Sequence, residues 1–241
     1  MSEVDRYYNE FYRELARLDA TGNDYSKVAE LLTEEVATGR RLRIVDVGCG
    51  YGSVSGALAS AGHEVYGVEI GNDAVRALPE RGIRPIKGDI GRSLPIADAT
   101  MDVVLLLDVL EHVFNPLWLL AEARRVLCDR GAVVITVPLY FDLVDRVRLL
   151  VSGSILSYDN LVYGREVAGR FRSYNYDHIR FFRPRDVEEM MQLSGFKVHE
   201  RTFAPILAPR PLSRLKPAMR FLARQWPGLF AHAMKVRARK T

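Results

Sequence analysis

The sequence is poor in cysteine and has no long apolar run. Its two cysteines, Cys49 and Cys128, are too few for a disulfide framework or a four-cysteine zinc site. No apolar stretch reaches the ~18 residues of a membrane-spanning helix, and the richest run, Val103–Leu110, is interrupted by Asp108. The first residues, MSEVDRYYNEFYRE, are charged and lack the apolar core of a signal peptide. We therefore expect a reduced, cytoplasmic setting.

Acidic residues are missing from one end of the chain. Arg201–Thr241 contains ten Lys or Arg and no Asp or Glu, whereas the other 200 residues carry a net charge of −6. A solvated surface, an anionic substrate or an anionic membrane surface would each account for such a segment. The full chain of 241 residues is 48% hydrophobic and 27% charged, which excludes a disordered or collagen-like protein.

Strand-like and helical segments alternate along the first half of the chain. This pattern predicts right-handed βαβ units in a parallel sheet. The expected helices of this part are 2–19, 25–38, Ser53–Ala61, Asn72–Leu78 (stopped by Pro79) and Leu117–Leu127. The expected strands are Leu42–Val47, Glu64–Glu69, Ile83–Lys87, Asp102–Leu107 and Gly131–Val137.

After Pro138 the alternation lapses. Residues 139–177 form a long, aromatic-rich insertion, and such insertions in compact domains often serve as a lid or pocket wall. A helix over Arg185–Ser194 and a strand over Phe196–Phe203 follow. A basic, proline-containing segment, 205–228, then leads to a last expected strand over Leu229–Arg239.

A glycine cluster follows the first expected strand. Gly48, Gly50 and Gly52 alternate directly before a helix, so a ligand can approach the backbone and the free N–H groups of a helix start. Asp46, just before them, disfavours a pyrophosphate and suits a cationic or amino-bearing ligand. Glu69 ends the second strand 19 residues after Gly50, the spacing at which an acidic residue binds ribose hydroxyls.

Four strings carry a resemblance to a known family. VDVGCGYG, GVEIGNDAV, KGDI and MDVVLLLDVLEHVFNP resemble, in order, the motifs of class I S-adenosylmethionine-dependent methyltransferases. The resemblance implies a Rossmann-like α/β fold: a seven-stranded, mostly parallel sheet with helices on both faces and an antiparallel last strand. It divides the chain into N-terminal helices over the cofactor site (1–40) and a methyltransferase domain (41–241).

The resemblance also implies which residues bind the cofactor. The methionine moiety would be lined by the glycine turn, the ribose held at the end of the second strand, and the adenine at the end of the third. S-adenosylhomocysteine would be the product. The expected cofactor-binding residues are Asp46, Gly48, Cys49, Gly50, Gly52, Glu69, Ile70, Asp89, Ile90 and Asp108.

Titratable residues follow the fourth strand, where parallel sheets bind ligands. Asp108, Glu111 and His112, with His178 after the insertion, resemble the pattern of ubiquinone-biosynthesis O-methyltransferases and small-RNA 3′-end methyltransferases. In those families an acidic-x-x-Glu-His motif and a later histidine hold a divalent metal. Three interpretations of His112 stay open: a structural histidine, a metal ligand with Asp108, Glu111 and His178, or a general base. Mg²⁺, Mn²⁺ and Zn²⁺ all suit such ligands.

The expected activity is methyl transfer to the hydroxyl of a small molecule, such as a sugar or a quinone precursor, with His112 and His178 handling the proton. A lipid-linked or RNA acceptor, a nicotinamide-dependent oxidoreductase and a non-catalytic cofactor-binding subunit are the alternatives. The basic, apolar stripe of Leu212–Trp226 suggests peripheral membrane contact. DNA is not an expected partner, and the absence of an RNA-binding module with interleaved aromatics counts against RNA. The oligomeric state stays open.

Overall fold

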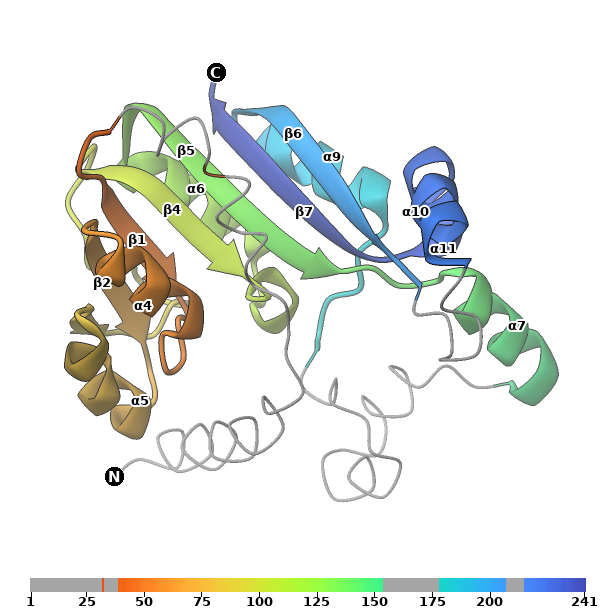
Figure 1. Ribbon diagram of the computed structural model, residues 1–241, viewed down its shortest axis with the longest axis horizontal. Coiled ribbons are helices and arrows are strands. Elements are labelled where there is room, and N and C mark those ends of the chain that lie inside the picture. Colours follow the sequence, from red (N-terminus) through yellow and green to blue (C-terminus); the bar gives the residue numbers. More distant parts are fainter. Residues whose placement is uncertain (1–31, 33–38, 154–177, 207–214) are drawn as a thin grey trace.

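The structure is a computed structural model that describes Leu32 and residues 39–153, 178–206 and 215–241. Its centre is a seven-stranded sheet in the order β3-β2-β1-β4-β5-β7-β6, shown in Figure 1. Six strands are parallel, and β7 runs antiparallel between β5 and β6, so the expected fold is confirmed. The strands are β1 Arg43–Val47, β2 Glu64–Glu69, β3 Arg84–Lys87, β4 Met101–Leu107, β5 Leu127–Pro138, β6 Phe196–Pro205 and β7 Ala231–Lys240.

Helices cover both faces of this sheet. Alternate residues of each buried strand point to opposite faces, and they separate the core into two clusters. One cluster packs under α6 and α9, and the other, which includes Leu32, packs under α4 and the turn at Leu78. The helices are α4 Ser53–Ser60, α5 Asn72–Ala77, α6 Pro116–Val126, α7 Leu143–Ser152, α9 Pro184–Leu193, α10 Lys216–Gln225 and α11 Pro227–Phe230, with short 3₁₀ helices at η2 Leu78–Arg81 and η3 Leu110–His112.

The α-helix expected to stop at Pro79 ends at Ala77. Pro79 then lies in the first turn of η2, where no backbone N–H is needed. Pro217 likewise lies in the first turn of α10. Strand β5 also starts earlier than expected, at Leu127, directly after α6.

Several sequence predictions fall on residues that the structure does not describe. The N-terminal helices over 2–19 and 25–38 lie outside the described residues, except for Leu32. The structure describes the insertion only from 139 to 153, where it contains α7. In the basic segment 205–228, residues 207–214 lie outside the described residues.

Backbone hydrogen bonds join the two described ends of the insertion. Leu139 forms a bridge with Phe182, and the Tyr140 N–H donates to the Phe182 carbonyl at 3.0 Å. The N–H groups of Ile179 and Arg180 donate to the Glu111 carbonyl at 2.9 and 3.1 Å. The base of the insertion is therefore fixed over the end of β4.

Candidate active site

The turn after β1 requires glycine. Gly48 and Gly52 have φ of 71° and 72°, in the left-handed region that side chains disfavour. A Cβ on Gly52 would lie 2.3 Å from Ile83 Cδ1, and one on Gly48 would lie 2.9 Å from Val109 Cγ2. The turn is thus packed between the end of β4 and the loop before β3. Because its glycines have no side chains, a ligand at the end of β1 can approach the backbone closely.

Glu69 ties this turn to the end of β2. Its buried carboxylate accepts hydrogen bonds from the N–H groups of Gly50 at 3.0 Å, Ile70 at 2.6 Å and Gly71 at 2.8 Å. These three bonds fix the carboxylate between the glycine turn and the chain that follows β2. Glu69 therefore shapes the site, and its expected contact with the ribose stays a prediction.

Asp46 and Cys49 are held under the turn. The Ser55 hydroxyl donates to the buried Asp46 carboxylate. Burial raises the pKa of Asp46 to about 7, against the lowering effect of the Ser55 bond and with a further rise from Glu69. Burial also raises the pKa of the Cys49 thiol, so this cysteine is not an activated nucleophile.

The two residues expected at the adenine differ in their surroundings. Ile90 lies beside the glycine turn, with its Cδ1 3.7 Å from the position of a Cβ on Gly48. Asp89 is exposed, accepts from the Gly91 N–H at 3.0 Å and pairs with Arg92 Nε at 3.2 Å. Ile90 is therefore in place to contact a ring, and Asp89 lies at the rim.

Asp108 is bound to the neighbouring strand. Its N–H donates to both the carbonyl and the hydroxyl oxygen of Thr136 at 3.0 Å, and the Thr136 hydroxyl donates back to Asp108 Oδ1 at 2.9 Å. Burial raises the pKa of this carboxyl. Asp108 has a φ of 53°. Among the described residues, the side chains close enough together to hold a metal ion do not include Asp108, which was an expected ligand.

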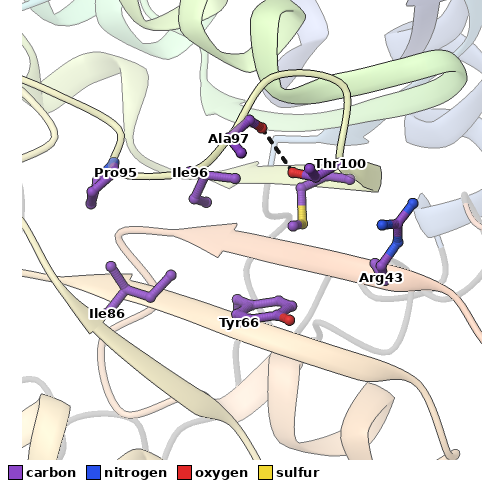
Figure 2. Close-up of a pocket in the computed structure, with 8 residues that line it drawn as sticks. Arg43, Tyr66, Ile86, Pro95, Ile96, Ala97 and Thr100 are labelled. Carbon is purple, nitrogen blue, oxygen red and sulfur yellow. Dashed lines mark hydrogen bonds between the residues drawn. The ribbon is translucent and has the colours of Figure 1, made fainter.

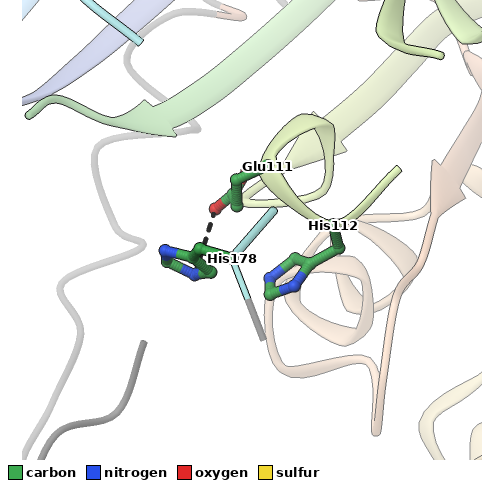
Figure 3. A group of neighbouring side chains, drawn as sticks. All are labelled: Glu111, His112 and His178. Carbon is green, nitrogen blue, oxygen red and sulfur yellow. Dashed lines mark ion pairs between the residues drawn. The ribbon is translucent and has the colours of Figure 1, made fainter. Parts of the chain in front are cut away.

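Glu111, His112 and His178 come together beyond β4, as Figure 3 shows. One ligand atom from each lies within 4.8 Å of the others. Glu111 is fully buried, and its Oε1 lies 3.8 Å from Nε2 of the buried His178. The two imidazoles meet edge to face with ring centroids 4.7 Å apart. Two histidines that are 66 positions apart in the sequence thus lie beside one buried carboxylate.

Tyr140 belongs to the same cluster and was missed by the sequence analysis. Its hydroxyl hydrogen-bonds His178 Nδ1, and its ring packs edge to face on Phe181 with centroids 4.8 Å apart. Since Tyr140 follows the carboxyl end of β5, next to β4, its place after Pro138 was the available signal.

A separate pocket of about 310 Å³ lies between one face of the sheet and the loop that carries Pro95 and Thr100 (Figure 2). It is lined by the first residues of β1 and β4, Arg43 and Met101, and by Tyr66, Ile86 and Ile96. None of the expected site residues lines it, and ligands of open α/β sheets bind at the carboxyl ends of strands. We therefore place the active site at the glycine turn.

Comparison with curated proteins identifies methyltransferases. A ubiquinone biosynthesis O-methyltransferase of Burkholderia thailandensis is 27% identical over 165 residues, which are 66% of this chain and 66% of that protein. The chain thus spans just under two thirds of that relative's length. An uncharacterized methyltransferase of Mycobacterium sp. (strain JLS) is 36% identical over 128 residues, 52% of this chain and 49% of that protein.

Solved structures share the fold. A SAM-dependent methyltransferase of Thermotoga maritima superposes with a TM-score of 0.63 at 20% identity, covering 97% of this chain and 98% of that one. The magnesium protoporphyrin IX methyltransferase of Synechocystis PCC 6803, solved with bound SAH, gives a TM-score of 0.56 at 17% identity, with coverage of 90% and 83%.

A family model described as a methyltransferase domain matches residues 8–201, which is most of the chain. This match includes the glycine turn, Glu69 and the cluster beyond β4. It confirms the expected enzyme family and sets aside the nicotinamide-dependent alternative. The chain belongs to the methyltransferase-domain family.

Proposed function

We propose that this chain transfers the methyl group of S-adenosylmethionine to a hydroxyl group of a small-molecule acceptor bound at the base of the insertion. The Glu111–His112–His178 cluster is the observation that supports this proposal. It lies next to the cofactor turn, because Val109, three residues before His112, packs against Gly48. A hydroxyl must lose its proton to attack a methyl group, so it needs a general base. An acceptor that already has a strongly nucleophilic lone pair does not need one.

The reaction is an in-line displacement on the methyl carbon. The acceptor oxygen forms the new C–O bond, the C–S bond breaks, and its electron pair stays on the sulfur of S-adenosylhomocysteine. The acceptor proton passes to His112, which is only partly buried. His178 has Glu111 at Nε2 and Tyr140 at Nδ1, so it is held in a fixed orientation beside His112, and the Glu111 carboxylate balances the charge of the protonated cluster. Holding the acceptor in line contributes about 7–11 kcal/mol to the barrier reduction.

A divalent metal fits the same three residues. Zn–N and Zn–O bonds of about 2.0–2.2 Å place two ligands of one ion roughly 3–4 Å apart. The 3.8 Å between Glu111 Oε1 and His178 Nε2 meets this, and the widest separation, 4.8 Å, needs a small closure. Two imidazoles and a carboxylate suit Zn²⁺ or Mn²⁺ better than Mg²⁺. Bound there, the ion would lower the pKa of the acceptor hydroxyl.

The Burkholderia relative is named as an O-methyltransferase, which supports a hydroxyl acceptor over an amine. Its place in ubiquinone biosynthesis belongs to that protein, and for this chain a sugar, a quinone precursor or a lipid-linked hydroxyl compound all fit the proposal. We infer that the reaction takes place in the cytoplasm. None of the described helices is long and apolar enough to cross a membrane.

The test is an acceptor screen that measures S-adenosylhomocysteine formation with paired hydroxyl and amine compounds. His112→Gln and His178→Gln are each expected to lower turnover roughly 10²–10⁴-fold on a hydroxyl acceptor, with S-adenosylhomocysteine affinity unchanged. His199→Gln, an exposed histidine on β6, is the matched control and keeps full turnover. Preferred methylation of the amines, or full turnover by His112→Gln, would contradict the proposal.

A further inference from the structure

Helix α7 displays an apolar face that no described element covers. Leu143, Val144, Val147, Leu150 and Val151 follow the i, i+1, i+4, i+7, i+8 spacing that puts side chains on one face. All five are exposed, Leu150 by 85% and Val151 by 82%. No residue of α7 is buried. A face of this kind usually binds a partner or a membrane surface.

The charges of α7 are arranged around this face. At 3.6 residues per turn, Arg146 and Arg148 lie on its two flanks, and Asp145 lies nearly opposite to it. The Asp145 carboxylate turns back to accept from the Phe141 N–H at 3.0 Å. An apolar face with basic flanks and the acid on the far side is typical of a helix in the plane of an anionic membrane interface.

The C-terminal basic segment lies next to α7. Arg146 Nη2 donates to the Gly228 carbonyl at 3.3 Å, and Figure 1 shows α7 beside α11. Trp226, two residues before Gly228, is 56% exposed, and tryptophan is enriched at membrane interfaces. The chain from Ala204 to its end has no acidic residue, so the segment that α7 contacts at Gly228 carries only positive charge.

The stripe expected to touch a membrane, within Leu212–Trp226, stays a prediction, and part of it packs on the protein. In α10, which packs on β6, Met219 and Leu222 are half-buried and the adjacent Ala223 is fully buried. Helix α7, which has no buried residue, therefore offers the more exposed apolar face of the two.

We propose that α7 binds the surface of an anionic lipid bilayer and holds the active site at that surface. Ten helical residues span about 15 Å, so α7 lies in the interface and does not cross it. Tyr140 is three residues before α7, which limits their separation to about 11 Å. Combined with the proposed function, this geometry favours an acceptor hydroxyl that belongs to a lipid or a lipid-linked compound.

The experiment is flotation of the full chain with phosphatidylcholine vesicles, with and without phosphatidylglycerol. The wild type is expected to float with the anionic vesicles and not with the neutral ones. Leu150→Glu lowers this partitioning at least about tenfold, because it places a charge in the centre of the apolar face. Arg148→Gln lowers it about fivefold, the equivalent of about 1 kcal/mol for one basic residue near an anionic surface.

Leu149→Glu is the matched control. Leu149 is 46% exposed on the polar side of the same helix, so this variant loses no more than the roughly fivefold that one unit of charge accounts for. Matching circular dichroism and melting midpoints show that both variants fold. Equal binding by the Leu149 and Leu150 variants, equal binding to neutral vesicles, or a wild-type dimer that Leu150→Glu dissociates would overturn the proposal. None of these measurements uses the cofactor or an acceptor. A negative result would therefore overturn the membrane proposal and leave the proposed function untouched.

Discussion

Asp46→Asn tests whether the carboxyl under the glycine turn is forced to stay protonated by burial. The folded pKa of about 7 exceeds the ordinary value of 3.8. Between these values the folded protein binds the proton and the unfolded chain does not, so wild-type stability falls as the pH rises. Each pH unit in this range removes about 1.4 kcal/mol. From pH 5 to pH 8 the wild type therefore loses about 2–3 kcal/mol that Asp46→Asn keeps.

The assay is urea unfolding of both proteins at pH 5 and pH 8, with the exposed Asp129→Asn as control. We expect the free energy of unfolding of Asp46→Asn, relative to wild type, to rise by about 2–3 kcal/mol between the two pH values. Asp129→Asn changes equally at both. If Asp46→Asn also shows the same difference at pH 5 and pH 8, the carboxyl is ionised throughout and the reasoning from burial is refuted.

Three further substitutions test the packing and the cluster. Gly52→Ala should destabilise the fold by about 2–4 kcal/mol in thermal or urea unfolding, since a Cβ meets Ile83 in a left-handed backbone; an unchanged midpoint would contradict the close approach. Arg125→Ala should cost about 1–3 kcal/mol, because its guanidinium donates to two backbone carbonyls of the loop before β4 at 2.8 and 2.9 Å; stability like that of wild type would refute this. Tyr140→Phe should shift the side-chain ¹⁵N resonances of His178 without lowering the melting midpoint, and an unchanged spectrum would show that the hydroxyl bond is absent.

The fold could be predicted from the sequence where the local pattern and the tertiary structure agree. The continuous apolar run over Asp102–Leu107 predicts a strand buried on both faces, and β4 is found at Met101–Leu107 with almost every residue buried. The early start of β5 could not be predicted, because Cys128, Asp129 and Arg130 show no strand pattern. Pairing of Met101 with Leu127 across an irregular register is what extends the strand there.

The site could be predicted in its residue types but not in its full membership. His112 follows β4 and His178 follows the insertion, and the hydrogen bonds from Ile179 and Arg180 to the Glu111 carbonyl help to bring them together. Tyr140 joins through its bond to His178, 38 positions further along the chain. Asp108 follows β4, as predicted. Its hydrogen bonds to Thr136 could not be predicted, because they depend on the pairing of β4 with β5.

The face of α7 could have been found from the sequence. Leu143, Val144, Val147, Leu150 and Val151 have the helical spacing, but they lie in a segment rich in aromatic residues and mixed charge. The spacing alone predicts an amphipathic helix and does not say whether its apolar face is buried. Only the exposed fractions separate a core helix from a surface that binds a partner.

Calorimetric titration of the purified chain with S-adenosylhomocysteine, with NADH as control, tests the central claim most directly. The account predicts saturable binding of S-adenosylhomocysteine and none of NADH. At about 100 times the dissociation constant the ligand should add ~2.7 kcal/mol to the free energy of unfolding. A folded sample that binds no S-adenosylhomocysteine, with or without Zn²⁺ or Mn²⁺, or that binds NADH instead, would contradict the assignment of the glycine turn and Glu69 to this cofactor.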